Sequence, residues 1–177
     1  MNTLFETRRL VARRFLPRDI EAFVAMRNDP EVARYQSWES YSEAEGRAFL
    51  EDLARLHPGC PGWYQVALED KATGRFVGDC GIRIMEHEPR LAQIGYTIAR
   101  DGWNRGLATE AVGGLVDYMF AAFPLHRITA SADPRNAASC RVLEKAGFVK
   151  EAHFRQSEWF KGEWADDVVY ARLRSNP

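Results

Sequence analysis

The most informative stretch of the chain is WNRGLATEAVGGLVDYMF, from Trp103 to Phe120. A glycine-containing turn at its start runs directly into a segment whose apolar residues recur every three or four positions, which predicts a helix with a broad buried face. The segment before it, LAQIGYTIA from Leu91 to Ala99, is rich in β-branched and aromatic residues and predicts a strand. The buried face of the helix is expected to contain Ala108, Ala111, Val112, Leu115 and Met119.

A strand, a turn and a helix in this order aim free backbone N–H groups at one point. The first N–H groups of a helix have no partner inside the helix, and the helix dipole favours an anion beside them. Gly106 has no side chain, so the backbone around it can approach a phosphate group closely. An ordinary turn is the commoner explanation of a glycine at a helix start, and turn chemistry alone leaves the phosphate site as a hypothesis.

The composition narrows the functional classes. The chain has 177 residues, of which 46% are apolar, which favours one domain with a substantial core. A net charge of −1 provides no general attraction to nucleic acid or to an anionic membrane. No apolar run is long enough for a membrane span, and the N-terminus lacks the pattern of a secretory signal. The three cysteines (Cys60, Cys80, Cys140) favour a reducing cytoplasm over a disulfide framework, and the histidines show no metal-ligand spacing.

A second informative run is DPRNAASCRVLEKAGF, from Asp133 to Phe148. Asn136 can cap a helix there, and Gly147 can end it. The other expected elements are a strand over 7–15, a helix from Pro17, a short turn over 30–35, a helix from Ser42 to about Leu56 that opens with a Ser42–Glu45 capping box, a hairpin over 63–69 and 76–85, a strand over 126–132, and a hairpin over 148–160 and 164–173.

The two informative runs resemble motifs A and B of the GNAT acyltransferase superfamily. WNRGLA, from Trp103 to Ala108, resembles motif A, Gln/Arg-x-x-Gly-x-Gly/Ala, and departs from it at Trp103. An aromatic residue at that position is similar to the ribosomal-protein N-terminal acetyltransferase branch. Motif B is matched by Asn136, Ser139, Gly147 and Phe148. The resemblance extends to ETRRLVARRF and NDPEVARY near the start and to Glu158-x-x-x-Gly162-x-x-x-Asp166 near the end, in the expected order.

The resemblance implies an α/β fold with a mixed, mostly antiparallel sheet of about seven strands flanked by about four helices. It implies one N-acetyltransferase domain over residues 1–177, with acetyl-CoA as acyl donor and no metal. In this superfamily the backbone amides of motif A hold the diphosphate, and the Asn and Ser of motif B lie along the pantetheine arm. The implied acetyl-CoA-binding residues are Ile98, Ala99, Arg105, Gly106, Leu107, Ala108, Thr109, Asn136 and Ser139.

Transfer of an acetyl group to an amine needs a base for the ammonium and a donor for the leaving thiolate. Many superfamily members use a Tyr of the motif B helix as the acid, but no Tyr lies between Asn136 and Gly147. Ser139 occupies the Ser position of the motif that the run resembles and is the candidate donor, and back-bonding within the first helical turn is its alternative role. Glu158 is the candidate base, because a Glu at this position is a suspected base in the related branch. A solvated strand carboxylate is the alternative.

Several other side chains have a structural interpretation that we prefer. Glu110 lies in the first turn of a helix, where the dipole alone favours a carboxylate. Cys140 is turned away from Ser139 by the helical spacing and is interpreted as a core thiol. His126 and His153 are interpreted as strand-end residues. Asp79, in contrast, is the second candidate for the catalytic base, after Glu158.

The sequence thus predicts an acetyl-CoA-dependent N-acetyltransferase that works by direct transfer in a ternary complex. The acceptor is expected to be a primary amine, either a protein N-terminus or a small molecule. The main alternative is a non-catalytic CoA-binding sensor or scaffold. A nucleotide-phosphate-binding protein is disfavoured because the chain lacks Gly-Lys-Ser/Thr and Gly-x-Gly-x-x-Gly runs. The oligomeric state, including a homodimer, is left open.

Overall fold

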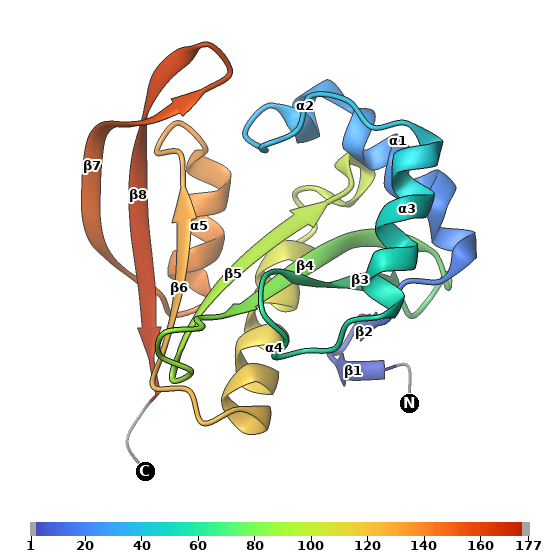
Figure 1. Cartoon of the computed structure of the whole chain (residues 1–177), viewed down its shortest axis with the longest axis horizontal. Coiled ribbons are helices and arrows are strands. Elements are labelled where there is room, and N and C mark those ends of the chain that lie inside the picture. Colours follow the sequence, from blue (N-terminus) through green and yellow to red (C-terminus); the bar gives the residue numbers. More distant parts are fainter. Residues whose placement is uncertain (1–2, 175–177) are drawn as a thin grey trace.

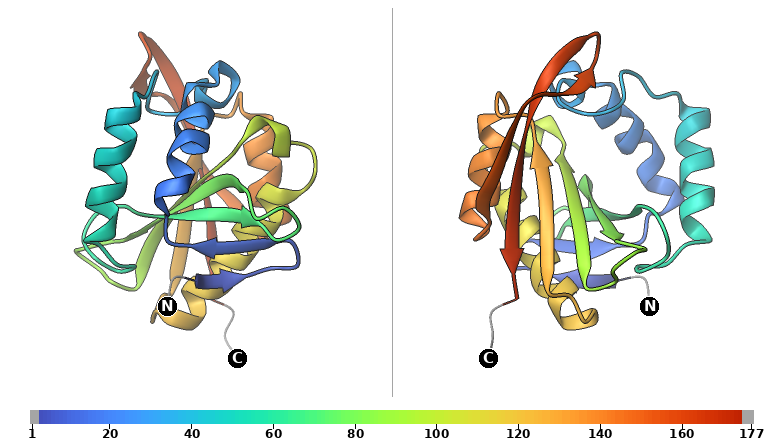
Figure 2. Two further views of the ribbon diagram at one scale, coloured as in Figure 1. Left: turned by 90° about the vertical axis from the view of Figure 1, so that its right-hand side faces the viewer. Right: turned by 60° about the vertical axis from the view of Figure 1, so that its left-hand side comes forward.

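The computed structural model describes residues 3–174 and contains an eight-stranded mixed sheet with helices on both faces (Figure 1). Helices α4 and α5 cover one face, and α1, α2 and α3 lie on the other (Figure 2). The strands are β1 (Thr3–Glu6), β2 (Leu10–Arg13), β3 (Tyr64–Asp70), β4 (Phe76–Ile84), β5 (Leu91–Ile98), β6 (Arg127–Ala132), β7 (Val149–Phe160) and β8 (Glu163–Leu173). The helices are α1 (Ile20–Asn28), α2 (Pro30–Ala33), α3 (Glu43–Ala54), α4 (Leu107–Ala122) and α5 (Ala137–Lys145), with 3₁₀ turns at Pro17–Asp19 and Arg100–Gly102.

The strand order is β1-β2-β3-β4-β5-β6-β8-β7, and every neighbouring pair is antiparallel except β5 and β6. That parallel pair is short, because Leu91–Gln93 pairs with Arg127–Thr129 and the ladder then stops. Both strands continue beyond this point and diverge (Figure 1). The sheet therefore opens in its middle, between α4 and α5.

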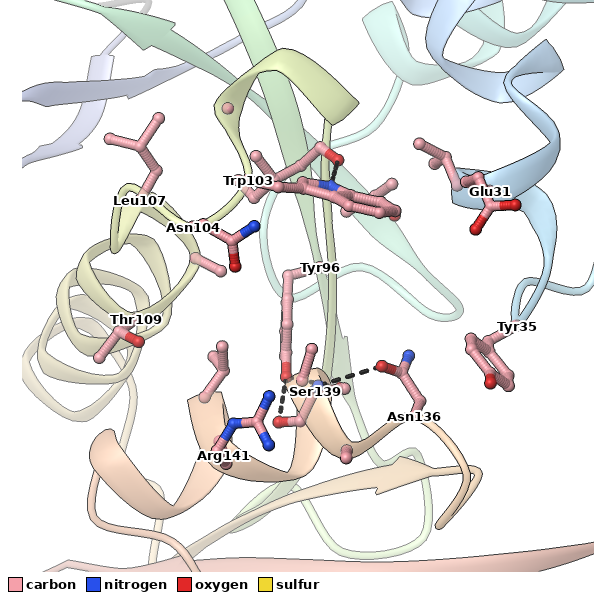
Figure 3. Close-up of a pocket in the computed structure, with 18 of the residues that line it drawn as sticks. Glu31, Tyr35, Tyr96, Trp103, Asn104, Leu107, Thr109, Asn136, Ser139 and Arg141 are labelled. Carbon is pink, nitrogen blue, oxygen red and sulfur yellow. Dashed lines mark hydrogen bonds between the residues drawn. The ribbon is translucent and has the colours of Figure 1, made fainter.

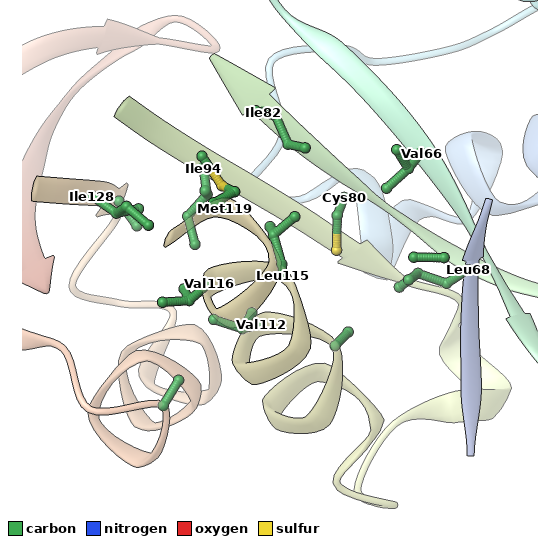
Figure 4. Close-up of a cluster of buried hydrophobic side chains, with 14 of the residues drawn as sticks. Val66, Leu68, Cys80, Ile82, Ile94, Val112, Leu115, Val116, Met119 and Ile128 are labelled. Carbon is green, nitrogen blue, oxygen red and sulfur yellow. The ribbon is translucent and has the colours of Figure 1, made fainter. Parts of the chain in front are cut away.

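The core lies mainly between α4 and the sheet (Figure 4). The predicted helix face is buried, with Val112, Leu115 and Met119 fully covered against strand residues such as Ile94 and Ile128. A second cluster packs α1 and α3 against the opposite face through aromatic side chains. Burial of large apolar side chains on both faces fixes the sheet between its helices.

The N-terminal strand prediction was wrong in its boundaries. The strand predicted over 7–15 is the shorter β2, and the chain also forms β1, which was not predicted, with a tight turn at Thr7–Arg9 between the two strands. The turn closes through the Thr7 N–H, which donates to the carbonyl of Leu10 at 2.9 Å. It is also held by the Glu110 carboxylate, which accepts from Thr7 Oγ1 and from the Arg9 N–H. A contact with a residue so distant in the chain leaves no local pattern. With β1 included, the sheet has eight strands, where about seven were expected.

The predicted helix caps are confirmed. Ser42 and Glu45 form the capping box of α3, with Glu45 N–H donating to Ser42 Oγ and Ser42 N–H donating to Glu45 Oε2. Asn136 caps α5 by accepting the Ser139 N–H at 3.1 Å. The turn expected at 30–35 is the short helix α2, capped by Asp29. Over residues 3–174, no helix is both long enough and apolar enough to cross a membrane.

Candidate functional site

A cleft of about 590 Å³ opens where β5 and β6 diverge (Figure 3). One wall is the end of β5 with the turn that leads into α4, the second is the first turns of α5, and the third is α2 with the residues after it. The cleft thus joins the two runs that the sequence singled out. Its polar or aromatic lining residues include Tyr35, Tyr96, Thr97, Trp103, Asn104, Thr109, Asn136 and Ser139.

Along the cleft, β5 presents backbone groups without a strand partner. The Ala99 N–H donates to the carbonyl of Val77, and the Leu91 carbonyl accepts from the Met85 N–H. The backbone N–H and C=O groups of the odd-numbered residues of β5 therefore point toward β4. The backbone groups of the even-numbered residues within 94–98 point to the other side, toward β6, where the β5–β6 ladder has already ended. An extended chain with amide groups can hydrogen-bond to this edge as an added strand.

The turn that leads into α4, where the sequence predicts an anion site, has left-handed backbone. Asn104 has φ 57° and Gly106 has φ 73°, so the turn uses left-handed backbone just before the helix. Gly106 adopts this conformation at little cost because it has no Cβ. Among the described residues no side chain caps α4. The first N–H groups, over 107–109, therefore remain available beside the cleft.

Trp103 closes this turn against the strand. Its indole Nε1–H donates to the carbonyl of Ile98 at 2.7 Å, which is one of the β5 groups that β6 no longer covers (Figure 3). The aromatic residue at the first position of the motif therefore has a structural role that the sequence did not reveal. It fixes where the strand ends relative to the start of α4.

Glu110 has the structural role that we preferred from the sequence. Its carboxylate accepts from Thr7 Oγ1 at 2.6 Å, from the Arg9 N–H at 2.7 Å and from Arg9 Nε at 2.7 Å. Arg9 Nη1 also donates to the carbonyl of Arg105 at 2.8 Å. Burial raises the pKa of Glu110, but these hydrogen bonds outweigh it, and the pKa is lowered overall. The β1–β2 turn thus holds the start of α4 in place.

Ser139 lies at the opposite wall, in the first turn of α5. Its Oγ is 2.8 Å from the hydroxyl oxygen of Tyr96, which projects from β5 across the opening of the sheet (Figure 3). Burial raises the pKa of the Tyr96 phenol, and the hydrogen bond with Ser139 offsets only part of that. Tyr96 was not predicted as a site residue from the sequence. The only available hint was its place near the end of the strand that leads into the motif.

Charge in the cleft is suited to an anionic ligand. Four cationic side chains contribute to the lining but only one carboxylate, although the chain as a whole has a net charge of −1. Of the four, Arg135 is ion-paired with Asp133 and Glu163. The four cationic residues are Arg34, Arg135, Arg141 and Lys145, and the carboxylate is Glu31.

The structure brings together most, but not all, of the predicted site residues. Ala99, Arg105 and Glu158 lie outside the lining of the cleft. The Arg105 carbonyl is held by Arg9, as described above. The predicted residues that do line the cleft are Ile98, Gly106, Leu107, Ala108, Thr109, Asn136 and Ser139.

Glu158 lies on β7, opposite Ala165 of β8, with its side chain exposed. A second carboxylate, Asp167 of β8, is partly buried nearby. Burial raises the pKa of Asp167, and the charge of Glu158 raises it further, while a hydrogen bond with Ser131 opposes the shift. The charge of Glu158 thus acts on the protonation of Asp167. Asp167 was not considered from the sequence.

Asp79 has a different environment from the one a base needs. Its carboxylate is 3% exposed and accepts from Arg27 Nη2 at 2.8 Å. The Arg27 guanidinium also stacks 3.6 Å from the ring centroid of Trp38. Burial raises the pKa of Asp79, although the Arg27 charge opposes this. This ion pair joins β4 to α1, so Asp79 serves packing of the α1 face.

Comparisons with known proteins agree with this geometry. The family model described as an acetyltransferase (GNAT) domain matches residues 9–149. An uncharacterized N-acetyltransferase of Bacillus licheniformis, p20, is 31% identical over 176 residues, which cover 98% of this chain and 97% of that protein. A GNAT-family acetyltransferase from Bacillus anthracis has a TM-score of 0.84 at 27% identity, with 98% of each chain covered. A ribosomal-protein-S5-alanine acetyltransferase from Vibrio fischeri has a TM-score of 0.82 at 26% identity, with 96% and 95% covered.

The open mixed sheet, with a cleft between two helix starts, defines an acyltransferase fold of the GNAT type. The chain belongs to the GNAT acetyltransferase family, an enzyme family, as the resemblance of its two motifs predicted.

Proposed function

We propose that this protein is an acetyl-CoA-dependent N-acetyltransferase that moves the acetyl group directly to a primary amine in a ternary complex. One observation supports this most strongly. The uncapped start of α4, the free edge of β5 and the Ser139 hydroxyl all border the same cleft. These groups fit, in turn, a diphosphate, a chain of amides and a sulfur atom. We also propose that residues 1–177 act as one such domain in the cytoplasm.

In this proposal the backbone N–H groups over 107–109 bind the diphosphate, because they are free and lie at the positive end of the helix dipole. Arg141 and Lys145, which line the same cleft, add positive charge for the phosphates. The backbone groups of the even-numbered residues within 94–98 of β5 hydrogen-bond to the amides of the pantetheine arm. Asn136 acts indirectly, because its side chain is engaged in capping α5 and so fixes the position of Ser139.

The chemical step requires one carboxylate and one donor. Glu158 removes the proton from the acceptor ammonium, directly or through water, and Asp167 beside it is the alternative base. The amine nitrogen then bonds to the thioester carbonyl carbon, the carbon–sulfur bond breaks with its electron pair on sulfur, and the second proton of the attacking nitrogen is released to water. Ser139 donates a hydrogen bond to the resulting thiolate. Direct transfer needs no enzyme nucleophile, so no cysteine takes part.

For the acceptor we propose a protein N-terminus first and a small-molecule primary amine second. The Vibrio fischeri relative is named for an alanine of a ribosomal protein, and the relation to it supports the first class. Glu158 and Asp167 are carboxylates on neighbouring strands and favour a cationic group in either class. A non-catalytic CoA-binding sensor is the second candidate function, since Glu158 lies outside the cleft lining.

The test has two readouts. Calorimetry should show binding of acetyl-CoA, and Gly106→Val should weaken it about tenfold or more, which corresponds to about 1.4 kcal/mol. The reason is that a β-branched residue resists φ 73° and shifts the N–H groups. Gly113→Val is the matched control on α4, where an added Cβ meets no atom within 4 Å.

The second readout is thiol release from acetyl-CoA across a panel of N-terminal peptides and small amines. Release that depends on one class of amine supports the enzyme. Binding without release for any amine supports the sensor, and equal affinity of the folded Gly106→Val variant would remove α4 from the proposed site.

A further inference from the structure

Among the described residues that line the cleft, Tyr96 is the one side chain of β5 that forms a hydrogen bond with α5 across the opening of the sheet. Its hydroxyl oxygen lies 2.8 Å from Ser139 Oγ and 3.1 Å from the Ser139 carbonyl oxygen. Both contacts are within hydrogen-bond range. A phenol therefore reaches the sulfur-binding end of the proposed site from the strand, although the α5 helix itself carries no tyrosine.

The two contacts cannot use the same proton. A carbonyl oxygen only accepts, and a phenol has one proton to give. If Tyr96 donates to the carbonyl, then the Ser139 hydroxyl must donate to Tyr96, and its proton points away from the cleft. If Tyr96 donates to Ser139 Oγ instead, the Ser139 proton is free to point into the cleft. Rotation of two hydroxyl groups therefore switches Ser139 between a donor engaged by Tyr96 and a donor available to a ligand.

We infer that Tyr96 is a positioning residue for the acetyl transfer, which orients the Ser139 hydroxyl so that it donates to the leaving sulfur. This inference rests on the proposed function. As the carbon–sulfur bond breaks and its electron pair moves to sulfur, the Ser139 proton turns toward the sulfur. The Tyr96 proton turns from the carbonyl to Ser139 Oγ, so that both hydroxyl groups remain hydrogen-bonded.

Neither hydroxyl gives up its proton in this step. A thiol has an ordinary pKa of about 8.5 and a phenol of about 10, so a thiolate does not deprotonate a phenol appreciably. Burial raises the pKa of Tyr96 and strengthens this conclusion. Two linked hydrogen bonds polarise each other. A Ser139 hydroxyl that accepts a hydrogen bond from Tyr96 is therefore a stronger donor to the thiolate than a Ser139 hydroxyl without that bond. The support exists only when charge develops on sulfur, so it acts on turnover more than on binding.

The test is a double-mutant cycle with Tyr96→Phe, Ser139→Ala and the double variant. Tyr96→Phe keeps the ring and removes only the hydroxyl group. It should lower kcat about 3- to 10-fold, the size expected for one hydrogen bond, and change the Kd for acetyl-CoA less than twofold. Because Tyr96 acts through Ser139, adding Tyr96→Phe to Ser139→Ala should cause no further loss of kcat.

Tyr118→Phe is the matched control, since Tyr118 is a partly buried tyrosine of α4 that packs on Phe5 and Phe123, away from Ser139. Its kcat should equal that of the wild type. Thermal unfolding of each variant reports whether the fold is intact.

Wild-type kcat in folded Tyr96→Phe, or losses that multiply in the double variant, would overturn the role of Tyr96 and leave the proposed function standing. If the wild type binds acetyl-CoA but acetylates no amine of the panel, the proposed function and this inference both fail.

Discussion

Ser139 is held by three contacts at once: its N–H by Asn136, its carbonyl oxygen and its hydroxyl by Tyr96. Glu158 has no comparable restraint, since it is an exposed residue on the edge strand β7. The two proposed catalytic side chains therefore differ in how far they are preorganised. A donor held by hydrogen bonds at sulfur and an exposed base at the acceptor are compatible with acceptors of different shape.

Replacement of Glu158 by Gln should lower kcat by roughly 10²-fold, the lower range for loss of a general base, with little change in the Kd for acetyl-CoA. The loss should be partly recovered at higher pH, where more acceptor is already deprotonated. Ser139→Ala should lower kcat without that recovery, because it affects the leaving group. A pH–rate series on both variants measures this. If Glu158→Gln turns over like the wild type at every pH, Asp167→Asn is the next variant to measure.

The cysteines should be dispensable for chemistry. Cys140 follows Ser139 but packs against the core cluster, and burial raises the pKa of Cys80, which keeps it a thiol. Cys140→Ala should therefore keep kcat within about twofold of the wild type, as expected for a change outside the reacting groups. Intact-protein mass spectrometry after mixing with acetyl-CoA should show no acetyl adduct. An adduct that disappears in Cys140→Ala would contradict direct transfer.

At the scale of elements, α4 depends on a distant turn for its position. The Glu110 carboxylate links the start of α4 to the β1–β2 turn and is only 16% exposed. Removal of a charged hydrogen-bond acceptor of this kind costs about 1–3 kcal/mol. Glu110→Gln should therefore lower the free energy of unfolding at neutral pH by an amount in that range. Glu51→Gln, which changes an exposed carboxylate on α3, is the control.

The same variant tests the sign of the pKa shift. The folded-state pKa of Glu110 is lowered, so its contribution to stability is fully present above the ordinary pKa of 4.5 and is lost as the pH falls through the folded value. The difference in unfolding temperature between wild type and Glu110→Gln should be largest above about pH 5 and shrink in acid. A difference that stays constant down to pH 3 would show that Glu110 acts through packing and not through its charge.

Elements whose cause is local were predictable. The turn at 103–106, the apolar face of α4, the Ser42–Glu45 capping box and the Asn136 cap each follow from residues a few positions apart. The hairpin of β1 and β2 was not predicted, because its turn is held by Glu110 from across the fold and such a contact leaves no local pattern.

The site divides in the same way. Gly106 and Ser139 lie in recognisable motifs, and both line the cleft. Tyr96 and Asp167 depend on which strands pair and in which register, so no local pattern marks them. The environment of Asp79 also depends on a partner from another element, Arg27 of α1. Because the sequence does not show this ion pair, Asp79 was predicted as the second candidate base.

At the scale of the whole molecule, the sheet consists of two parts, β1–β5 with α4 and β6–β8 with α5, joined in the sheet only by the short β5–β6 ladder. The proposed ligand site lies on the border between these parts, with Leu107 and Thr109 of α4 on one side and Ser139 and Arg141 of α5 on the other (Figure 3). A ligand bound there contacts both parts and should couple their stabilities.

Acetyl-CoA should therefore slow amide hydrogen exchange in both parts at once, over 107–109 at the start of α4 and over 137–140 at the start of α5. At a concentration 100 times its Kd, it should raise the free energy of unfolding by about 2.7 kcal/mol. At the same ligand concentration, a Kd weakened tenfold by Gly106→Val should halve this stabilisation to about 1.4 kcal/mol. The loss of protection should appear in α5 as well as in α4, although residue 106 is outside α5, because both depend on one bound molecule. Protection confined to α4, with α5 exchanging as in the free protein, would show that the ligand does not bridge the open sheet.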